Sequence, residues 1–502
     1  MPGEFFPEVL FKVRILMITP EATPFAKTGG LGEVLAALPE ELVDLGLEVD
    51  VLLPKYRGIS PEAYPIENTG QTVTLTLNAK EINAGIWQLR KKKGLRYLFL
   101  ECDQYYDREN LYGTAEGDYE DNAERYVFLT RAGIEMGPAA GIRYDVFHSH
   151  DWQAALAPVY LRTLYAGEQL LESGASVITI HNLGYQGIFW HLDMPLVGVG
   201  WEFFTPKYME FHGRLNFLKS GIVFAEEVNT VSPGYCKEIL TPAFGFGLEG
   251  VLQEKGPHLT GIINGVDYKV WNPATDPRIA SEFSTSDLSG KSACKADLQR
   301  SARLPLKPDV PVIAMVSRLS SQKGIDIFEG ALGPLLQKDL QFVLLGTGDA
   351  RYHEKFEQIA KEAPDKTGIF LTYDDELAHK IFAGSDMLLV PSRYEPCGLN
   401  QLYALKYGAV PIVRSTGGLE DTVEEYDPDL DVGTGFKFVP QDPPALESTI
   451  LKAVDVYLNK PEPWKRLMIR GMSRDFSWTR SAKEYIRLYE KAVEGRYRSR
   501  LR

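Results

Sequence analysis

The stretch VRILMITPEATPFAKTGGLGEVLAALPEELVDLGLEVDVLL, residues 13–53, sets the fold class of the chain. It starts with Val13–Ile18, an apolar run typical of a buried strand. After a loop rich in Gly and Thr, leucines and valines recur at helical spacing from Leu31 to Leu45, and Gly46 ends the expected helix. Glu48–Leu53 is a second strand candidate, so the stretch predicts a parallel strand–helix–strand unit.

Strands and helices continue to alternate on both sides of residues 265–310, a segment rich in Pro, Ser and Asp. Before it, the strand candidates are Thr72–Leu77, Ile86–Arg90, Arg96–Leu100, Asp145–His148, Val177–His181, Val228–Val231 and Leu259–Ile263. After it, they are Val312–Val316, Phe342–Leu345, Ile369–Thr372, Met387–Val390 and Val410–Val413, with helical stretches such as Ile325–Leu336 and Leu399–Tyr407 between them. Two such series predict an α/β protein with two doubly wound domains.

These patterns divide the chain into four parts. We expect an N-terminal α/β domain over residues 12–264, a linker region over 265–310, a C-terminal α/β domain over 311–478 and a terminal helix over 479–502. A chain of 502 residues has room for this arrangement, since domains typically contain roughly 100–200 residues. The sequence Ser481-Ala-Lys-Glu484 has the spacing of a capping box and marks the expected start of the terminal helix.

The charge balance argues against several classes of protein. The chain carries 54 Lys and Arg against 68 Asp and Glu, a formal net charge of −14, which disfavours general nucleic-acid binding and attachment to an anionic membrane surface. The basic run Arg90–Gly94 is interpreted as a charged hairpin turn rather than as a ligand patch. No apolar run approaches the roughly 20 residues that a membrane span needs.

Cysteine usage and the N-terminal segment bear on the compartment. The four cysteines, Cys102, Cys236, Cys294 and Cys397, lie far apart without a CxxC pair, which argues against a zinc ribbon or a disulfide framework. They fit a reducing compartment. Met1–Lys12 lacks a basic n-region, so we expect no signal peptide. Together these features predict a cytoplasmic enzyme.

In the first half of the chain, two predicted strands are followed by polar residues. The loop Lys27-Thr-Gly-Gly30 opens a helix, where backbone N–H groups and the helix dipole attract phosphate and Lys27 adds a positive charge. It lacks the GxxxxGK[ST] pattern of a P-loop, and a short Gly loop also arises by chance. His148-Ser-His150-Asp151 has the HxH spacing of a metal site, with His181 as a further ligand. Because other ligands are missing, we prefer a polar strand end with Asp151 facing a cleft.

In the second half, charged residues follow two predicted strands. Arg318 offers a planar fork and Lys323 a compact charge, which suits a diphosphate, although a solvated loop is the alternative. Glu395 follows the predicted strand Met387–Val390 and could bind sugar hydroxyls, stabilise positive charge or cap a helix. Ser415-Thr-Gly-Gly-Leu419 repeats the Gly loop of the first half, again between a strand and a helix.

Taken in order, these motifs resemble those of the bacterial glycogen synthases and plant-type starch synthases of glycosyltransferase family 5. The resemblance runs from about Val13 to the C-terminus. It rests on Lys27-Thr-Gly-Gly-Leu31, His150-Asp-Trp-Gln153, His181-Asn-Leu-Gly-Tyr-Gln-Gly187, Asn264-Gly-Val-Asp267 with Trp271-Asn-Pro273, Arg318 with Gln322-Lys-Gly324, Glu395-Pro-Cys-Gly-Leu399 and Ser415-Thr-Gly-Gly-Leu419. It implies the GT-B architecture, in which two doubly wound Rossmann-like domains face each other across a deep cleft and the terminal helix crosses back to the N-terminal domain.

The resemblance also implies an activity. Members of this family are retaining hexosyltransferases that move glucose from ADP-glucose to the non-reducing end of an α-1,4-glucan, the chain of glycogen or starch, and release ADP. They are thought to transfer on one face of the sugar, with the leaving phosphate taking the proton of the acceptor. No cofactor and no metal are then expected, and the sequence leaves the oligomeric state open.

The catalytic roles carry over residue by residue. By resemblance, Asp151, His181 and Glu395 surround the transferred glucose, while Arg318 and Lys323 neutralise the departing diphosphate. Preorganised charges of this kind stabilise a transition state in which the sugar becomes positive and the nucleotide negative. The expected substrate-binding residues, which would hold the phosphates and the adenine, are Lys27, Gly29, Gly30, Tyr373, Thr416, Gly417 and Gly418.

Two departures and several rival interpretations accompany the resemblance. Glu33 stands where the family usually has Asp, and Tyr403 stands where related retaining families carry a second Glu. A related GT-B enzyme that uses UDP-glucose or a small acceptor is the nearest alternative. A glycan-binding protein without catalysis is a second alternative, against which the charged residues argue. A pyridoxal-phosphate phosphorylase shares the fold but typically has a much longer chain.

Overall fold

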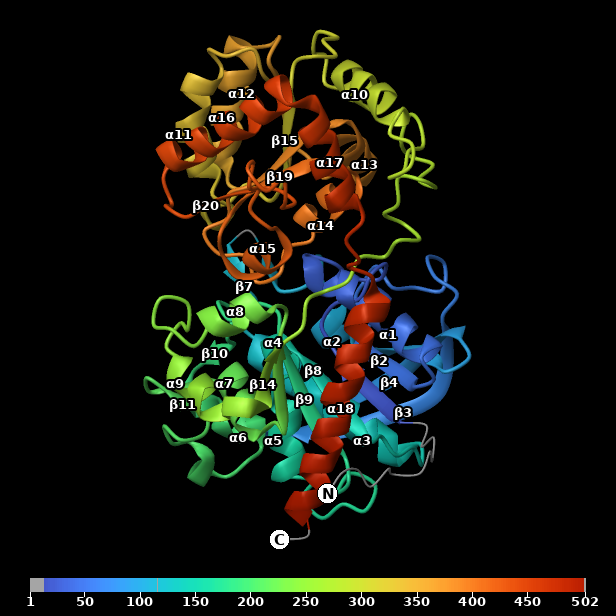
Figure 1. Ribbon diagram of the computed structural model, residues 1–502. Coiled ribbons are helices and arrows are strands. Elements are labelled where there is room, and N and C mark those ends of the chain that lie inside the picture. Colours follow the sequence, from blue (N-terminus) through green and yellow to red (C-terminus); the bar gives the residue numbers. More distant parts are fainter. Residues whose placement is uncertain (1–12, 115, 501–502) are drawn as a thin grey trace, which may run out of the picture. The chain divides into compact units, whose positions relative to one another are not determined.

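The computed structural model describes residues 13–114 and 116–500. Met1–Lys12, the segment for which no signal peptide is expected, therefore lies outside the described residues. The chain divides into two compact units (Figure 1). Unit 1 holds the described residues up to Val231, Cys236–Ile262 and the residues from Trp478 on, whereas unit 2 holds Ser232–Tyr235 and Ile263–Ser477.

Unit 1 is built on one large, mostly parallel sheet. Across the sheet, its strands are β14 (Leu259–Gly261), β13 (Glu227–Thr230), β9 (Ala175–Ile180), β8 (Val146–His150), β1 (Arg14–Ile18), β2 (Glu48–Pro54), β5 (Leu95–Glu101), β4 (Lys80–Lys92) and β3 (Glu67–Leu77). Neighbours from β14 to β5 pair in parallel, and β3, β4 and β5 pair as antiparallel hairpins. The turn from β4 to β5 falls in Arg90–Gly94, as predicted. Strand β1 is an apolar run because both faces of a parallel sheet are covered.

In unit 1, the first and the last helix of the described chain, α1 and α18, pack together. Its helices are α1 (Gly30–Asp44), α2 (Asp103–Tyr106), α3 (Asn122–Ala139), α4 (Asp151–Ala154), α5 (Leu156–Arg162), α6 (Met194–Val197), α7 (Phe217–Phe224), α9 (Glu249–Lys255) and α18 (Trp478–Arg500), and α8 (Pro233–Glu238) spans the division between the units. The last helix, α18, is the red helix of Figure 1 and packs against α1, β8, β9 and β13. The expected capping box is wrong, because α18 already begins at Trp478 and Ser481 lies inside its first turn, on the buried side.

Short elements decorate unit 1 outside the large sheet. They are β6 (Gly113–Thr114), β7 (Gly117–Asp118), β10 (Ile188–Phe189), β11 (Glu210–Phe211), β12 (Arg214–Asn216) and the 3-10 helices η1 (His191–Asp193), η2 (Trp201–Phe203) and η3 (Gly256–His258). Strands β10, β12 and β11 form a small antiparallel sheet of their own. This sheet follows directly on the segment that carries His181, so it extends the region of the predicted site.

Unit 2 is a second doubly wound domain. Its parallel sheet has the order β17 (Thr367–Phe370), β16 (Gln341–Leu345), β15 (Val312–Val316), β18 (Met387–Val390), β19 (Val410–Arg414) and β20 (Phe436–Phe438). The helices are α10 (Gly290–Ser301), η4 (Ser321–Lys323), α11 (Ile325–Leu335), α12 (Ala350–Glu362), α13 (Asp375–Gly384), α14 (Asn400–Lys406), α15 (Gly417–Thr422), α16 (Pro443–Asn459) and α17 (Pro461–Met472). Alternate residues of β15 enter two separate apolar cores, Ile313 one and Ala314 the other, so both faces of the sheet are covered.

The expected linker region, residues 265–310, is instead part of unit 2. Trp271 lies between the rings of His379 and Tyr403, with centroid distances of 3.8 and 4.0 Å and nearly parallel planes. Cys294 and Leu298 of α10 are buried in the same apolar core as β15. The Pro, Ser and Asp content that suggests a linker therefore belongs to a packed extension of the domain, held by aromatic and apolar contacts that composition does not reveal.

Candidate active site

Five of the predicted site residues lie in unit 1, each just after the carboxyl end of a strand. Lys27 and Gly29 belong to the loop between β1 and α1, and Gly30 is the first residue of α1, whereas Asp151 follows β8 and His181 follows β9. In the sheet, β1 lies between β2 and β8, so the strands that follow β1 in the sequence are added first on one side of it and later on the other. Such a switch point opens a crevice at the carboxyl ends of the strands, which is where doubly wound folds bind ligands.

A carboxylate that the sequence analysis overlooks organises the Gly loop. Glu21 is 4% exposed, and its two carboxylate oxygens each accept a hydrogen bond of 2.6 Å, one from the backbone N–H and one from the hydroxyl of Thr28. The N–H of Gly29 also donates to Glu21, at 3.3 Å, and the hydroxyl of Tyr112 donates at 2.5 Å. The loop expected to bind phosphate therefore already presents two of its N–H groups to an internal anion.

Lys27 has an internal partner as well. Its ammonium lies 2.6 Å from a carboxylate oxygen of Glu33, in the first turn of α1, and both side chains are about one-third exposed. Glu33 is the residue that departs from the usual Asp of the family. The carboxylate of Glu33 reaches the lysine in the loop before α1, so a carboxylate lies beside Lys27 in spite of the departure.

Asp151 is held in an unusual conformation at the end of β8. Its φ of 54° lies in the left-handed region, which non-glycine residues rarely adopt. One carboxylate oxygen accepts the backbone N–H of His181 at 2.7 Å and that of Asn182 at 3.4 Å. Burial raises the pKa of Asp151 to about 7, against these hydrogen bonds, and the charge of Glu21 adds to the rise. The group is thus poised to change charge near neutrality.

The histidines beside Asp151 are neutral hydrogen-bonding groups. His181 Nε2 lies 3.1 Å from Nδ1 of His150, and one of the two nitrogens donates to the other. Burial lowers the pKa of His181 to about 3, and burial together with His148 and His181 lowers that of His150 well below its ordinary value. At neutral pH His181 therefore offers a ring nitrogen rather than a positive charge.

A buried polar network ties these histidines to the last helix. His148 Nε2 lies 2.6 Å from the hydroxyl of Thr179, which itself donates to the side-chain oxygen of Asn229 at 2.6 Å. Since Thr179 has one proton, His148 must donate through Nε2 and accept through Nδ1 from the hydroxyl of Tyr489, at 2.9 Å. The ring of His148 packs on that of His150 with a centroid distance of 4.1 Å. Thr179 thereby fixes the tautomer of His148, and Tyr489 of α18 donates to the remaining ring nitrogen.

The other seven predicted site residues lie in unit 2. Its strand order, with β15 between β16 and β18, is the Rossmann order, and the switch point falls between β15 and β18. Arg318 and Lys323 follow β15, and Glu395 follows β18, so these three residues come from the two strands that flank the switch point. Beyond them, Tyr373 follows β17, Thr416 lies between β19 and α15, and Gly417 and Gly418 are the first two residues of α15.

Lys323 and Glu395 form the charged centre of this second group. Their side chains meet at 2.6 Å, and the hydroxyl of Ser392 donates to the same carboxylate oxygen at 2.8 Å. Glu395 is 7% exposed, so the pair is largely shielded from water. Gly324, next to Lys323, lets its loop pack closely on Pro391, which precedes Ser392. Its φ is 70°, and a Cβ there would lie 2.1 Å from the carbonyl oxygen of Pro391. Arg318, by contrast, is exposed.

The second Gly loop packs directly on the segment that carries Glu395. The backbone N–H of Gly418 donates to the carbonyl of Glu395 at 3.1 Å, and a Cβ on Gly418 would lie 2.1 Å from the carbonyl oxygen of Cys397. Thr416 is buried, whereas Tyr373 is 71% exposed at the end of the sheet. The loop therefore fixes the Glu395 backbone, whereas the Tyr373 side chain lies largely at the surface.

Comparison with known proteins identifies the family. The starch synthase catalytic domain family matches residues 14–254, and the glycosyl transferases group 1 family matches residues 299–466. The glycogen synthase of Koribacter versatilis is 45% identical over 484 residues, which is 96% of this chain and 99% of that protein. This chain belongs to the glycogen synthase family. Glycogen synthase 1 of Geobacter sulfurreducens is 42% identical over 97% of both chains.

Solved structures place this family member among the GT-B hexosyltransferases. The catalytic domain of starch synthase IV from Arabidopsis thaliana, bound to ADP and acarbose, has a TM-score of 0.89 and 33% identity over 96% of this chain and 99% of that one. A sucrose-phosphate synthase from Thermosynechococcus elongatus, at 19% identity and a TM-score of 0.60 over 95% and 98% of the two chains, shares the fold. The expected two-domain GT-B fold is confirmed. Within the described residues, none of the helices has the length and apolar character of a membrane span.

Several residues of this glycogen synthase family member escape sequence reasoning. Glu21 follows the first strand after Thr19 and Pro20, and its place at a strand end is a signal that could have found it. Ser392 lies three residues before Glu395, within reach of one loop. Tyr112 and Tyr489 give no such signal, because they reach the site from distant segments that only the fold brings together.

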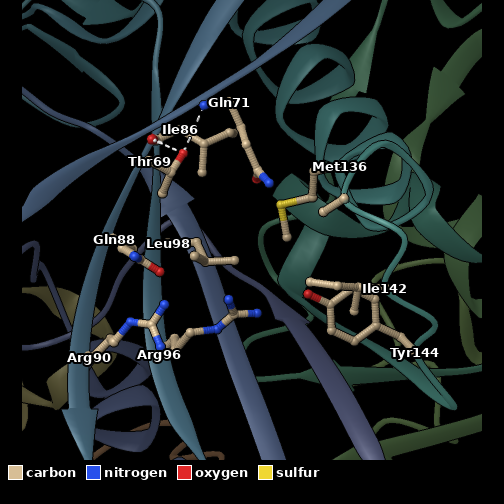
Figure 2. A pocket seen from close by; sticks show the side chains of 11 residues that line it. Thr69, Gln71, Ile86, Gln88, Arg90, Arg96, Leu98, Met136, Ile142 and Tyr144 are labelled. Carbon is tan, nitrogen blue, oxygen red and sulfur yellow. Dashed lines mark hydrogen bonds between the residues drawn. The ribbon is translucent and has the colours of Figure 1, made fainter.

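A cavity in unit 1 lies apart from these groups of residues. Figure 2 shows it between strands β3 to β5 and the end of α3. Its volume is about 210 Å³. Arg90, Arg96 and Gln88 point into it from the strands, opposite Met136 and Tyr144. Arg96 is already held by Asp50 through two hydrogen bonds of 2.7 and 2.6 Å. The predicted site residues are not among those that line it.

Proposed function

We propose that this protein transfers glucose from ADP-glucose to the non-reducing end of an α-1,4-glucan, with retention of configuration, and releases ADP. The chain covers nearly the whole length of glycogen synthases to which it is more than two-fifths identical, which supports the acceptor class. The observation that carries the proposal is the contact of Lys323 with Glu395 at 2.6 Å, at the switch point of the second sheet.

The chemistry explains why a cation and a carboxylate are needed together. When the bond between glucose C1 and the phosphate oxygen breaks, the sugar becomes positive and the diphosphate takes the electron pair. Lys323, with Arg318 on the same loop, stabilises the diphosphate, and Glu395 stabilises the sugar. A new bond then forms from the acceptor oxygen to C1 on the same face, and the acceptor proton passes to the leaving phosphate. In this proposal Glu395 acts as a charge stabiliser, and Lys323 and Ser392 hold one of its two carboxylate oxygens in place.

The remaining residues bind and orient the donor. In this proposal, Asp151 and His181 contact the glucose, and the loop from Lys27 to Gly30 lies near the phosphates. The loop from Thr416 to Gly418 holds the distal phosphate at the start of α15. Tyr373, exposed at the end of the sheet, stacks on the base. The starch synthase structure with ADP and acarbose supports an adenine nucleotide, because that protein is 33% identical over almost the whole chain.

Nucleotide release with glycogen as acceptor tests the proposal. The purified protein is incubated with ADP-glucose or with UDP-glucose, and the released nucleotide and the glycogen-bound glucose are measured together. We expect ADP release that is much faster than UDP release and matched by incorporated glucose. Preferential UDP release would favour the rival UDP-glucose enzyme. Absence of transfer from either donor would overturn the proposal in favour of a non-catalytic glycan-binding protein.

We further propose that no metal ion takes part in the transfer. Arg318 and Lys323 supply the positive charge that a divalent cation provides in many other phosphate-releasing sites. Chelation with EDTA should then leave turnover unchanged. Loss of turnover in EDTA that one added divalent cation restores would contradict this part of the proposal.

A further inference from the structure

A ridge of exposed aromatic rings lies beside the catalytic group of unit 1. Trp190 is 58% exposed and Trp201 is 50% exposed, which is unusual for the largest apolar side chains. His191 and Phe204, both partly exposed, lie between them. The ring centroids are 5.6 Å apart from Trp190 to His191, 6.1 Å from His191 to Phe204 and 5.7 Å from Phe204 to Trp201. We call these four residues the aromatic ridge.

The segment of the aromatic ridge that carries Trp201 and Phe204 is anchored in the unit by Phe203 and by backbone hydrogen bonds. Phe203, next to Phe204, packs on Tyr208 and Phe224, with centroid distances of 5.7 Å to each. The backbone N–H of Phe204 donates to the carbonyl of Trp201 at 2.9 Å, and that of Met209 donates to Phe203 at 3.1 Å. Because the backbone that carries Trp201 and Phe204 is anchored in this way, a ligand that covers the ridge has little chain to order, so the exposure of the rings favours a binding role over loose packing.

The ridge is joined to the predicted catalytic residues by one packed layer. Phe189, which precedes Trp190, lies 5.6 Å from the ring of Trp152, and Trp152 follows Asp151. Phe189 also packs on Phe217 at 4.7 Å. The chain runs directly from His181 through β10 to the ridge. A long ligand whose end lies at Asp151 and His181 could therefore extend across this surface.

We propose that the aromatic ridge is a binding site for the body of an α-glucan chain, separate from the subsites that hold the reacting sugars. The inference rests on the proposed function, which supplies a ligand with many glucose units. A glucose ring has an apolar face of C–H groups that packs on a flat aromatic ring, while its edge carries hydroxyls. The ring nitrogens of Trp190, His191 and Trp201 can bond those hydroxyls, a combination that an aliphatic patch lacks. Glycogen would thereby be retained between successive transfers.

The test compares a ridge variant with a matched control. The double variant Trp190→Ala and Trp201→Ala removes both exposed indoles, and Tyr497→Ala removes another exposed ring, 64% exposed, near the end of α18. Circular dichroism and thermal unfolding check that each variant folds. Affinity electrophoresis in gels containing glycogen, without donor, measures binding directly. Steady-state kinetics then give the KM for glycogen and for maltotriose, a short acceptor of three glucose units.

We expect the double variant to bind glycogen about tenfold more weakly, which corresponds to about 1.4 kcal/mol, whereas Tyr497→Ala binds like the native protein. In the double variant, the KM for glycogen should rise by a larger factor than the KM for maltotriose. Equal glycogen affinity of the folded double variant and the native protein would overturn the inference. A changed sedimentation coefficient with unchanged glycogen affinity would also overturn it, in favour of a contact between two copies of the chain. A native protein that fails to transfer glucose to glycogen would count against the proposed function, which electrophoresis does not test.

Discussion

The two groups of predicted site residues handle charge in different ways. In unit 1, burial keeps His148, His150 and His181 neutral and raises the pKa of Asp151 to about 7, so hydrogen bonds dominate. In unit 2, a lysine and a glutamate stay in direct contact at 2.6 Å. The contrast suggests a division of labour, in which unit 1 orients a neutral sugar by hydrogen bonds and unit 2 stabilises the charges that separate when the bond to phosphate breaks.

The sharpest way to break this comparison is to remove the cations of unit 2. Arg318→Ala and Lys323→Ala should each lower the turnover number by about a hundredfold or more, about 3 kcal/mol, because each removes one preorganised charge-stabilising group. Lys380→Ala is a matched control, since Lys380 also pairs with a carboxylate, Glu376 at 3.1 Å, but lies on α13. Turnover within threefold of the native value in both test variants would refute the role given to unit 2.

The pH dependence of turnover examines the other half of the comparison. Burial raises the pKa of Asp151 to about 7, so the carboxyl is neutral below that pH and negative above it. Because an ionised carboxylate accepts hydrogen bonds from sugar hydroxyls more strongly than a neutral carboxyl does, turnover should rise as the pH increases through about 7. Asp151→Asn should be slower and should lack this rise. If turnover of Asp151→Asn rises with pH in the same way as that of the native protein, the ionisation belongs to a different group.

Both sheets and their order of elements follow from sequence patterns, whereas the partners inside the site do not. Apolar strand runs and helical leucine spacing indicate two doubly wound domains, because burial on both faces leaves a clear signature. The same reasoning fails for residues 265–310, where Trp271 packs between His379 and Tyr403, more than a hundred residues away. It also fails for Tyr489, whose hydroxyl meets His148 across 341 positions. Contacts of this kind depend on tertiary structure, so no repeating pattern in the nearby sequence indicates them.

A smaller effect is expected when the last helix loses its link to the histidines. Tyr489→Phe removes the hydroxyl that donates to His148 Nδ1 and leaves a buried acceptor without its partner. Unfolding free energy should fall by about 1 kcal/mol, with a modest drop in turnover. Tyr497→Phe, on the same helix but exposed, serves as the control and should change neither quantity. A stability loss of equal size in both variants would show that the hydrogen bond to His148 is not its cause.

The central claim, that Lys323 and Glu395 act as one unit on the breaking bond, is tested most directly by a double-mutant cycle. Turnover with ADP-glucose and glycogen is measured for the native protein, Lys323→Ala, Glu395→Ala and the variant that carries both changes. Residues that act together give strongly non-additive effects, so the double variant should be about as slow as the slower single variant. If the two losses multiply instead, the residues act independently, and the account of a coupled charged centre in unit 2 is contradicted.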